Sequence, residues 1–259
     1  MNKQETRIKE IIKTVKEQRR VSINYLAEKF NVSVMTIRRD IGKIDNSEID
    51  YYHGILLYLP PVFSNQQDDS PYSIITALTK KKEEKQRIAR KALSLIKPNE
   101  SILLSSGSTT EYLAKIIPSE WKMEIICSSL NNVNILLNNP NCRLTIPGGE
   151  FHASSMVFQS AEGLEMLKKM RVKTTFISAY GVDINLGATC SASFERDLRQ
   201  TEIQIAETRV LLADSSKFGR IDHIHFAEIT DFDIIITDTA LPAETADKIR
   251  DLGLTLYTV

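Results

Sequence analysis

The stretch "VSINYLAEKFNVSVMTIRRDIGKI", residues 21–44, holds two short amphipathic segments separated by a tight turn. In the first segment Leu26, Ala27 and Phe30 share one face, which predicts a helix with that face buried. Ser22 precedes the segment and can cap the helix through its hydroxyl group. The pair "NV" then turns the chain, so a helix-turn-helix is expected here.

The second segment, residues 34–44, is expected to form the other helix of the pair, capped by Ser33. Val34, Ile37 and Ile41 form its apolar stripe. The exposed face is left with Met35, Thr36, Arg38 and Arg39. Such a mixture can contact both base edges and phosphates in a DNA major groove, although a solvated helix face has the same composition.

The flanking segments favour the DNA interpretation. Residues 5–18 carry aliphatic side chains at helical spacing, which predicts an amphipathic helix. Residues 48–59, "EIDYYHGILLYL", contain two β-rich runs around a His-Gly turn, which predicts a hairpin. Three helices followed by a hairpin describe a winged helix-turn-helix. The residues expected to contact DNA are Ser22, Ser33, Met35, Thr36, Arg38, Arg39 and Lys43.

The distribution of charge supports a nucleic-acid partner for this segment. Residues 1–43 contain 11 basic and 5 acidic residues, whereas the rest of the chain contains 22 basic and 28 acidic ones. The formal net charge of zero therefore hides a basic segment of +6 beside a body of −6. A basic segment on an acidic body is the electrostatic outline of a nucleic-acid-binding domain.

Composition narrows the class of protein and its compartment. The 259 residues allow a small domain plus a larger one, and 42% hydrophobic with 25% charged residues is typical of a globular protein. The three cysteines are widely spaced and odd in number, which favours a reducing cytoplasm over a disulfide framework. The first residues lack the apolar core of a secretory signal, and no apolar run reaches membrane-spanning length.

The remainder of the chain is predicted to be a doubly wound α/β domain. We expect a winged helix-turn-helix over residues 1–59, a linker over 60–73, rich in proline and amides, and an effector domain over 74–259. Continuous apolar runs alternate with helical patterns, which indicates a parallel sheet covered by helices on both faces. The runs span 101–105, 124–127, 143–146, 174–179, 209–213, 233–237 and 254–258. The helical patterns lie near 80–96, 109–117, 129–138, 160–170, 193–207 and 240–251.

A strand-to-helix turn in this domain, "LLSSGSTTEYLA" at residues 103–114, suits an anion. The first N–H groups of a helix are unpaired, and the helix dipole adds partial positive charge there, so a phosphate is the expected ligand. The segment "DSSKFG", residues 214–219, follows another strand and offers Lys217 to a phosphate or sugar oxygen. An Asp-capped turn with a surface lysine is the alternative. His223 and His225 are two residues apart, but no third ligand accompanies them, so no metal site is expected.

The segment "RRVSINYLAEKFNVSVMTIRRDIGKI", residues 19–44, resembles the N-terminal domain of DeoR-family transcriptional regulators. Five later segments resemble, in order, the sugar-phosphate-responsive domain of that family: "KEEKQRIARKAL", "SSGSTTEYLA", "PGGEFH", "GVDINLGAT" and "LLADSSKFG". The resemblance implies a cytoplasmic repressor, a homodimer or homotetramer, whose binding to operator DNA changes when a phosphorylated sugar binds. It implies no cofactor, no membrane and no catalytic residue.

We expect the sugar phosphate to lie over the 105–110 turn. The expected effector-binding residues are Ser105, Ser106, Gly107, Ser108, Thr109, Thr110, Gly148, Gly149, Asp183, Arg199 and Lys217. The chain departs from the family pattern at several of these places and near them. Ser105 stands in place of an Asp, Arg199 in place of a Lys, Cys127 and Ser128 in place of a Thr-Asn pair, and Phe158 in place of a Gly. In the hairpin, Tyr51 replaces an Arg and Ile55 a Gly, and an Arg usual before the helix near residue 80 is absent.

Two other functions remain open from the sequence. The turn also resembles the phosphate loop of ribose-5-phosphate isomerase, an enzyme whose proton transfer needs a carboxylate base. Asp183 is the acid retained at the matching strand end, and Glu195 or Asp214 could supply a second one. The other possibility is a DNA-binding regulator that the departures have left without effector sensing. The basic winged helix favours the effector-responsive regulator over the enzyme.

Overall fold

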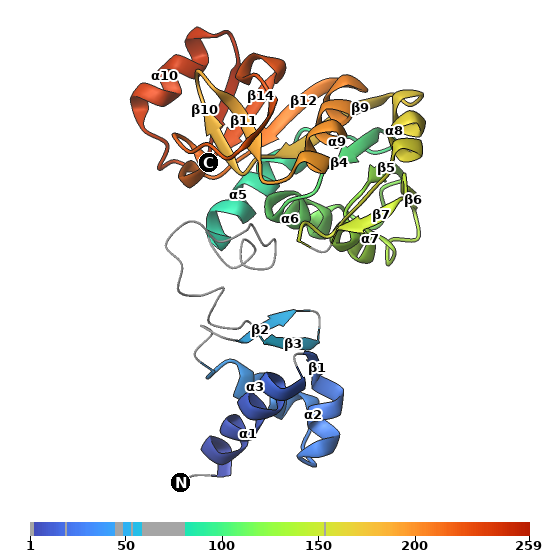
Figure 1. Cartoon of the computed structure of the whole chain (residues 1–259), viewed down its shortest axis with the longest axis vertical. Helices are drawn as coiled ribbons and strands as arrows, with labels where there is room; N and C mark the ends of the chain where they lie inside the picture. Colours follow the sequence, from blue (N-terminus) through green and yellow to red (C-terminus); the bar gives the residue numbers. More distant parts are fainter. Residues whose placement is uncertain (1–2, 19, 45–48, 53, 59–80, 153) are drawn as a thin grey trace. The chain divides into compact units, whose positions relative to one another are not determined.

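We analysed a computed structural model of the chain, which describes residues 3–18, 20–44, 49–52, 54–58, 81–152 and 154–259 (Figure 1). The chain divides into two units between residues 70 and 71, and each unit is described by itself. The linker expected over residues 60–73 lies outside the described residues. The exact domain boundaries therefore stay a prediction.

The N-terminal unit is a winged helix-turn-helix, as the sequence predicts. Its elements are α1 (Lys3–Gln18), β1 (Arg20–Ser22), α2 (Ile23–Lys29), α3 (Val34–Ile41), β2 (Ile49–Tyr52) and β3 (Ile55–Tyr58). The three strands form an antiparallel sheet in the order β1-β3-β2, in which β1 is an addition to the expected hairpin. His53, in the expected turn of that hairpin, lies outside the described residues.

The three helices enclose one small core, to which Ile11, Leu26, Ile37 and Leu56 contribute fully buried side chains. Both expected caps are confirmed. The Ser22 Oγ accepts a hydrogen bond from the Tyr25 backbone N–H at 3.1 Å, and the Ser33 Oγ accepts one from Thr36 N–H at 3.2 Å. Each cap pairs one of the N–H groups that a helix otherwise leaves unpaired at its start.

A buried carboxylate fastens α1 to α3, which the sequence did not indicate. Asp40 is fully buried, and it accepts hydrogen bonds from Arg7 Nε at 2.6 Å and Gln4 Nε2 at 2.7 Å. Burial alone would raise the pKa of Asp40, but the hydrogen bonds from Arg7 and Gln4 hold it below its usual value. The pair therefore stabilises the orientation of α3, the helix expected to bind DNA.

The second unit is built on a seven-stranded parallel sheet in the order β15-β14-β12-β9-β4-β5-β6. The strands are β4 (Ser101–Leu104), β5 (Met123–Cys127), β6 (Cys142–Thr145), β9 (Val172–Ser178), β12 (Ala206–Leu212), β14 (Ile234–Thr237) and β15 (Thr255–Thr258). Each corresponds to one of the seven apolar runs in the sequence. The prediction of a parallel sheet is confirmed because every neighbouring pair runs in the same direction.

Helices cover both faces of this sheet, which confirms the doubly wound α/β architecture (Figure 1). The helices among the described residues of this unit are α5 (Lys82–Leu93), α6 (Ser108–Ile116), α7 (Leu130–Leu136), α8 (Ala161–Lys168), α9 (Ser193–Gln204) and α10 (Ala243–Asp251). Leu104 and Phe176 pack with α5, α6 and α7 on one face. Their neighbours Leu103 and Ile177 point to the other face, toward α8, α9 and α10. Strands buried on both faces explain the continuous apolar runs.

Several short elements were not expected from the sequence. They are the hairpin β7 (Glu150–His152) with β8 (Val157–Gln159), the antiparallel sheet β10 (Gly181–Asp183), β11 (Gly187–Cys190) and β13 (Ile224–Ala227), and the 3-10 helices η2 (Ser215–Lys217) and η3 (Ile229–Asp231). In addition, α9 ends at Gln204, before the predicted end at residue 207, because β12 begins at Ala206.

The order of the strands identifies where a ligand would bind. From β4 the chain moves outward through β5 to β6, and it then returns to β9 on the other side of β4 before continuing to β12, β14 and β15. The direction of winding therefore reverses between β4 and β9. In open α/β sheets ligands bind in the crevice at the carboxyl ends of the strands at such a reversal.

Candidate nucleic-acid interface and ligand site

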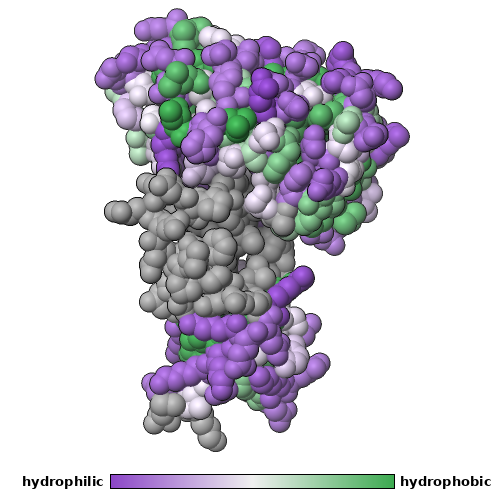
Figure 2. Space-filling view, in the orientation of Figure 1, coloured by the Kyte–Doolittle hydropathy of each residue, from purple (hydrophilic) through white to green (hydrophobic). Residues whose placement is uncertain are grey.

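The residues expected to contact DNA lie mostly on α3 and at its ends. Met35 is 71% exposed, and Arg38 and Arg39 are also exposed, whereas Thr36 is half-buried. Lys43 is exposed just beyond the helix, where its Nζ donates to the Gln4 Oε1 at 3.0 Å. The surface of this unit is largely hydrophilic in the view of Figure 2. The exposed face of α3 therefore carries the cations and the mixed side chains that a recognition helix needs.

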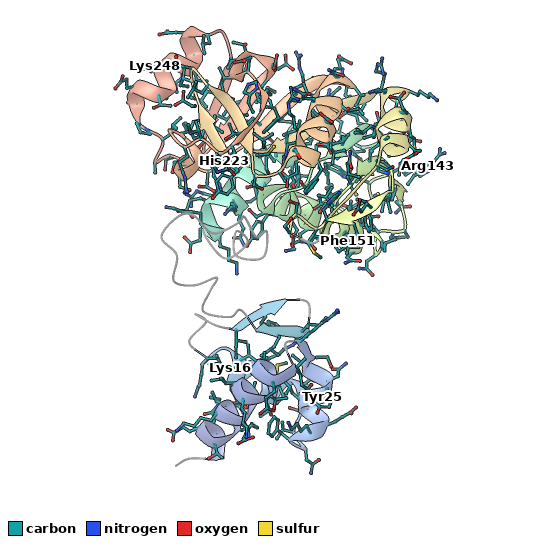
Figure 3. All side chains as sticks on the ribbon, viewed as in Figure 1. Lys16, Tyr25, Arg143, Phe151, His223 and Lys248 are labelled. Carbon is teal, nitrogen blue, oxygen red and sulfur yellow. The ribbon has the colours of Figure 1, made fainter. Side chains whose placement is uncertain are left out.

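The two serines hold different positions in the same unit. Ser33 is exposed at the start of α3, and Ser22 is exposed at the start of α2. Figure 3 labels Tyr25, whose backbone N–H donates to Ser22, on this unit. Because each hydroxyl already accepts a hydrogen bond from its own helix, capping is the structural role of both residues. A hydroxyl can still donate to a DNA phosphate, so the expected contacts remain a prediction.

Replacing Ser33 separates capping from DNA contact. We expect Ser33→Ala to lower the free energy of opening α3 by about 1 kcal/mol, as the hydrogen exchange of its amides would measure. Ser33→Asp should restore that stability, because a carboxylate caps equally well. If the hydroxyl also donates to a phosphate, the aspartate variant binds DNA more weakly than the wild type. Equal exchange in the wild type and the alanine variant would contradict the capping role.

The 105–110 turn connects β4 to α6 at the reversal of the sheet. Gly107 is the N-cap of α6 and has φ +154. A Cβ at this position would lie 2.5 Å from both Cβ and Oγ of Ser178, the last residue of β9. Only glycine therefore lets the turn approach the end of β9 so closely. The approach brings the start of α6 to the ligand-binding crevice of this fold class.

The hydroxyl groups of the turn are less available than the sequence suggested. The side chains of Ser105, Ser106, Ser108, Thr109 and Thr110 are all buried, with exposed fractions of 0 to 5%. The Thr110 hydroxyl is directed back into the turn, where it donates to the Ser105 carbonyl oxygen at 2.7 Å and to the Gly107 carbonyl oxygen at 2.8 Å. Its role is therefore to fix the turn, and the backbone N–H groups at the start of α6 are the natural donors to an anion.

Arg199 joins the turn to the end of β9. Its guanidinium group donates to the carbonyl oxygen of Ser178 and to Ser106 Oγ, the latter at 3.3 Å. It also forms an ion pair with Glu195, one helical turn earlier, at 3.2 Å. The exposed fractions of the two side chains are 6% and 3%, and Glu195 accepts a second hydrogen bond from Ser155. A buried cation therefore lies where the winding of the sheet reverses. Its partner Glu195 has a hydrogen bond to each carboxyl oxygen.

The other expected effector residues share the same sheet edge. Asp183, after β9, accepts hydrogen bonds from the backbone N–H groups of Asn185 and Leu186 at 2.9 and 3.1 Å, so it closes a local turn. Lys217, after β12, places its Nζ 5.0 Å from the centre of the Tyr180 ring. Gly148 and Gly149 follow β6 and lead into β7. The structure thus joins Ser106, Gly107 and Arg199 through Ser178, whereas these four follow other strand ends along the same edge.

Three groups of residues at this edge were missed by the sequence analysis. Asn132, in α7, donates from Nδ2 to the Ser105 carbonyl oxygen at 3.2 Å. Lys85, in α5, forms a buried ion pair with Asp214 at 3.5 Å. Glu202, in α9, is fully buried near the Ser105 hydroxyl, and Arg199 and Glu195 of the same helix also influence its pKa. Glu195, Arg199 and Glu202 are spaced by four and three residues, which places their side chains on one face of α9. This spacing could have indicated Glu202 from the sequence.

Asp238 is a further buried acid at the edge, directly after β14. It accepts hydrogen bonds from the backbone N–H groups of Ser215 at 2.6 Å and Ala240 at 3.0 Å. Burial alone would raise the pKa of Asp238, but these hydrogen bonds lower it. Asp238 therefore holds η2, and with it Lys217, against the end of β14.

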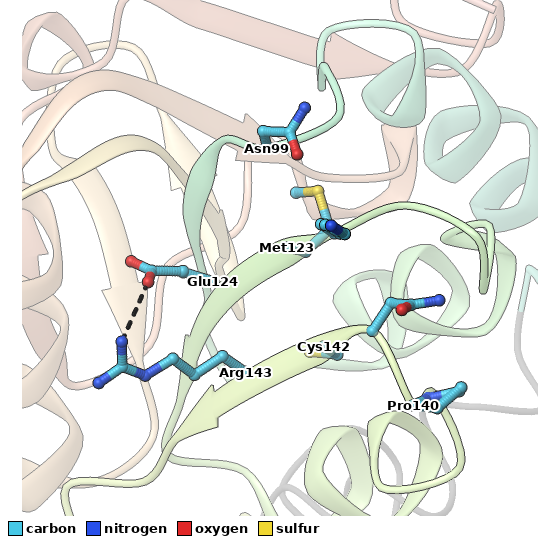
Figure 4. A pocket seen from close by; sticks show the side chains of 8 residues that line it. Asn99, Met123, Glu124, Pro140, Cys142 and Arg143 are labelled. Carbon is cyan, nitrogen blue, oxygen red and sulfur yellow. Dashed lines mark hydrogen bonds and ion pairs between the residues drawn. The ribbon is translucent and has the colours of Figure 1, made fainter.

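Two other surface features carry polar or titratable side chains. A surface hollow lined by Asn99, Lys122, Met123, Glu124, Pro140, Asn141, Cys142 and Arg143 lies where β5 and β6 begin, at the edge opposite to the turn (Figure 4). The side chain of His223 is 93% exposed (Figure 3), and His225 pairs with Glu228 at 3.3 Å. Within the described ranges no group of three metal-ligating side chains occurs. Nor is any helix in those ranges both long enough and apolar enough to cross a bilayer.

Comparison with known proteins gives matches over both units. Residues 7–56 match the family model of the DeoR-like helix-turn-helix domain, and residues 80–239 match that of the DeoR C terminal sensor domain. The deoxyribose operon repressor of Escherichia coli K12 is 29% identical over 91% of this chain and 91% of its own. A putative aga operon transcriptional repressor of Escherichia coli O157:H7 is 26% identical over 98% of this chain and 93% of its own.

An activator is also among the relatives. The L-fucose operon activator of Haemophilus influenzae is 29% identical over 90% of this chain and 91% of its own. Among solved structures, a D-ribose-5-phosphate isomerase in complex with phospho-erythronic acid covers 53% of this chain and 54% of its own, with 19% identity and a TM-score of 0.40. At that TM-score the likeness carries no argument about function.

Proposed function

The chain belongs to the DeoR family of transcriptional regulators, and from that premise we propose that it represses genes of sugar metabolism until a phosphorylated sugar binds its C-terminal unit. It is a DNA-binding transcriptional regulator modulated by a sugar effector. We propose three further points: the phosphate on that sugar, the direction of control and the residues that bind each partner. Because its partner is operator DNA, we place the protein in the cytoplasm.

The proposed DNA contacts come from the exposed face of α3. Met35, Arg38 and Arg39 stand on the outer side of a helix whose inner side is fixed by Ile37 and by the Asp40 ion pair. Arg38 and Arg39 can contact phosphates or guanine edges, and Met35 can contact a thymine methyl group. A recognition helix held by a buried core and a buried ion pair presents these side chains from a backbone that loses little conformational entropy on binding.

The proposed effector site is the edge formed by the 105–110 turn, Ser178 and Arg199. The observation that carries this proposal is the buried Arg199 guanidinium, which contacts both Ser106 and the carbonyl oxygen of Ser178 where the winding of the sheet reverses. Together with the start of α6, it makes this edge favourable for a phosphate. Lys217 and the turns at Asp183 and Gly148 would border the ligand.

Control of DNA binding requires two arrangements of the protein, which the ligand binds with different affinities. A sugar phosphate can shift operator affinity only as far as its own affinities for the two arrangements differ. Of the relatives named above, two are operon repressors and one is an activator. We therefore propose repression that the ligand releases. We also propose that the change of arrangement takes place within a homo-oligomer. A dimer places two α3 helices on successive major grooves of one operator.

A second candidate function, proton transfer on a sugar phosphate, is favoured by one observation. Burial raises the pKa of Glu202 to about 7, which is where a general base or acid works best at neutral pH. The other acids do not favour an enzyme, because Glu195, Asp183 and Asp214 are each engaged in a structural ion pair or turn. We therefore propose a sensor and treat isomerisation as the outcome to exclude.

One experiment tests the proposed function and the alternative together. The full chain is screened by thermal shift against triose, pentose and hexose phosphates, and each ligand that raises Tm is then incubated with the protein and followed by NMR. We expect at least one sugar phosphate to raise Tm and to remain chemically unchanged. Conversion of the ligand into another sugar would support the enzyme, and the absence of any shift at millimolar ligand would contradict effector sensing.

A further inference from the structure

Glu202 is a buried acid that the fold does not use. Its side chain is fully buried in the last turn of α9, and neither carboxyl oxygen has a hydrogen-bond partner among the described residues apart from the adjacent Ser105 hydroxyl. The hydroxyl group of Ser105 lies beside the carboxyl and has no other partner within that part of the chain. Two buried polar groups that have no partner except each other therefore lie directly next to the proposed phosphate site.

The same helix shows how this fold treats a structural carboxylate. Glu195, two turns earlier, is equally buried, but its oxygens are taken by Arg199 and Ser155. Buried carboxylates are normally paired in this way, because removing an unpaired polar group from water is unfavourable by about 1–3 kcal/mol or more. Glu202 has the cost of burial with only the Ser105 hydroxyl to offset it, which is the pattern of a group kept for a ligand.

The surroundings of Glu202 define the chemistry of that ligand. The charged or titratable groups near it are Arg199 and Glu195 on its own helix and the thiol of Cys127 at the end of β5. Burial raises the pKa of Glu202 to about 7, while the Ser105 hydroxyl and Arg199 oppose this shift and Glu195 adds to it. A phosphate would be repelled by the ionised carboxyl, whereas a sugar hydroxyl group can donate to it.

Further polar atoms without partners point the same way. Among the described residues, the Oγ of Ser178 and the Oδ1 of Asn132 are buried and have no hydrogen-bond partner. Ser178 ends β9, next to the turn, and Asn132 already donates to the Ser105 carbonyl from its other side-chain atom. Together with Ser105 and Glu202, the edge thus presents both donors and acceptors beside Arg199. This combination suits a polyol better than a bare anion.

We propose that Glu202 is a ligand-binding residue that accepts a hydrogen bond from a hydroxyl group of the sugar whose phosphate lies at the 105–110 turn. The proposal rests on the proposed function, since it needs an effector at that edge. It assigns discrimination between sugar phosphates and inorganic phosphate to one side chain of α9. Ser105 and Asn132 complete the sugar-binding surface.

The test compares two ligands on the full chain by isothermal titration: the sugar phosphate with the largest thermal shift, and inorganic phosphate. Glu202→Met fills the same space without an acceptor, and Glu202→Gln keeps one acceptor oxygen without charge. Glu244→Met, at an exposed position of α10, is the matched control. We expect Glu202→Met to bind the sugar phosphate about ten- to a hundredfold more weakly, as loss of a charge-assisted hydrogen bond requires, with Glu202→Gln between it and the wild type. Binding of inorganic phosphate should be unchanged.

The stability of the Glu202→Met variant distinguishes ligand binding from a purely structural role of Glu202. The pKa of Glu202 is raised from 4.5 to about 7 on folding, so between these pH values the folded chain binds more protons than the unfolded chain. The unfolding free energy contributed by Glu202 therefore falls as pH rises from 5 to 8. Without ligand, Glu202→Met should have a Tm equal to or above that of the wild type at pH 8, and the difference should shrink toward pH 5.

Each outcome decides the proposal. Weaker binding of the sugar phosphate with unchanged phosphate binding and an undiminished Tm supports it, and Glu202→Gln gives the same comparison if the methionine variant does not fold. Equal binding of the sugar phosphate by the wild type and both variants overturns it while leaving the proposed function standing. Failure of the wild type and the Glu244→Met control to bind either ligand overturns both.

Discussion

Replacing Ser108 with glutamate is expected to abolish binding of the sugar phosphate and to leave operator binding unchanged. Ser108 is the first residue of α6 and is 5% exposed, so a longer acidic side chain there enters the space of the proposed phosphate. Its negative charge also opposes that of the phosphate. The helix itself tolerates an acid in its first turn, because the dipole favours negative charge there by about 0.3–1 kcal/mol. We expect the ligand affinity to fall by at least about a hundredfold, which corresponds to about 2.7 kcal/mol.

The control for this variant is Ser108→Ala, which removes the hydroxyl group and adds no charge. Since backbone N–H groups are the proposed donors, the alanine variant should lose no more than about tenfold in affinity, the range of one hydrogen bond. Titration of the sugar phosphate into both variants measures the effect, and circular dichroism with operator binding checks their folding. Wild-type affinity in a folded Ser108→Glu variant would remove the phosphate from this turn.

Replacing Arg38 or Arg39 with alanine is expected to weaken operator binding. Both side chains are exposed on α3, and neither belongs to the core of the unit. Loss of a bidentate contact to a base costs about 1–3 kcal/mol, which is about five- to more than a hundredfold in affinity. Loss of a phosphate contact also reduces the slope of log affinity against log salt by about one unit. Fluorescence anisotropy with the chain's own promoter at several salt concentrations separates the two roles.

Arg143→Ala is the matched control, because that arginine is 82% exposed on β6 in the other unit. It should bind the promoter as the wild type does. A folded Arg38→Ala, Arg39→Ala double variant with unchanged affinity and unchanged salt dependence would exclude α3 as the recognition helix. The DNA contacts would then have to be sought elsewhere on the N-terminal unit.

The regular elements could be predicted because their signal is local. The central strands of the parallel sheet include apolar runs such as "DIIIT", and burial on both faces is what produces such runs. The hairpin β7-β8 and the sheet β10-β11-β13 were missed because their strands are only three or four residues long and none is an uninterrupted run of large apolar residues. Their pairing is set by tertiary contacts, which a local pattern does not record.

The site was predictable in outline and not in its details. The 105–110 turn and Arg199 could be named because a strand-turn-helix signal and a resemblance pointed to them. The burial of the turn hydroxyls and the inward direction of Glu202 depend on how α9 packs on the sheet. The family resemblance implies an acid at position 105, where this chain has serine. In the structure the carboxyl group of Glu202 reaches the side chain of Ser105 from α9 instead.

The most direct test of an effector-controlled regulator measures operator affinity with and without ligand. Labelled promoter DNA is titrated with the full chain by fluorescence anisotropy, first alone and then with a saturating concentration of the sugar phosphate identified by thermal shift. We expect the ligand to weaken DNA binding by about five- to a hundredfold, the usual range of a coupling free energy, and Ser108→Glu to abolish that change. Identical operator affinity with and without a ligand that demonstrably binds would contradict coupling between the two units.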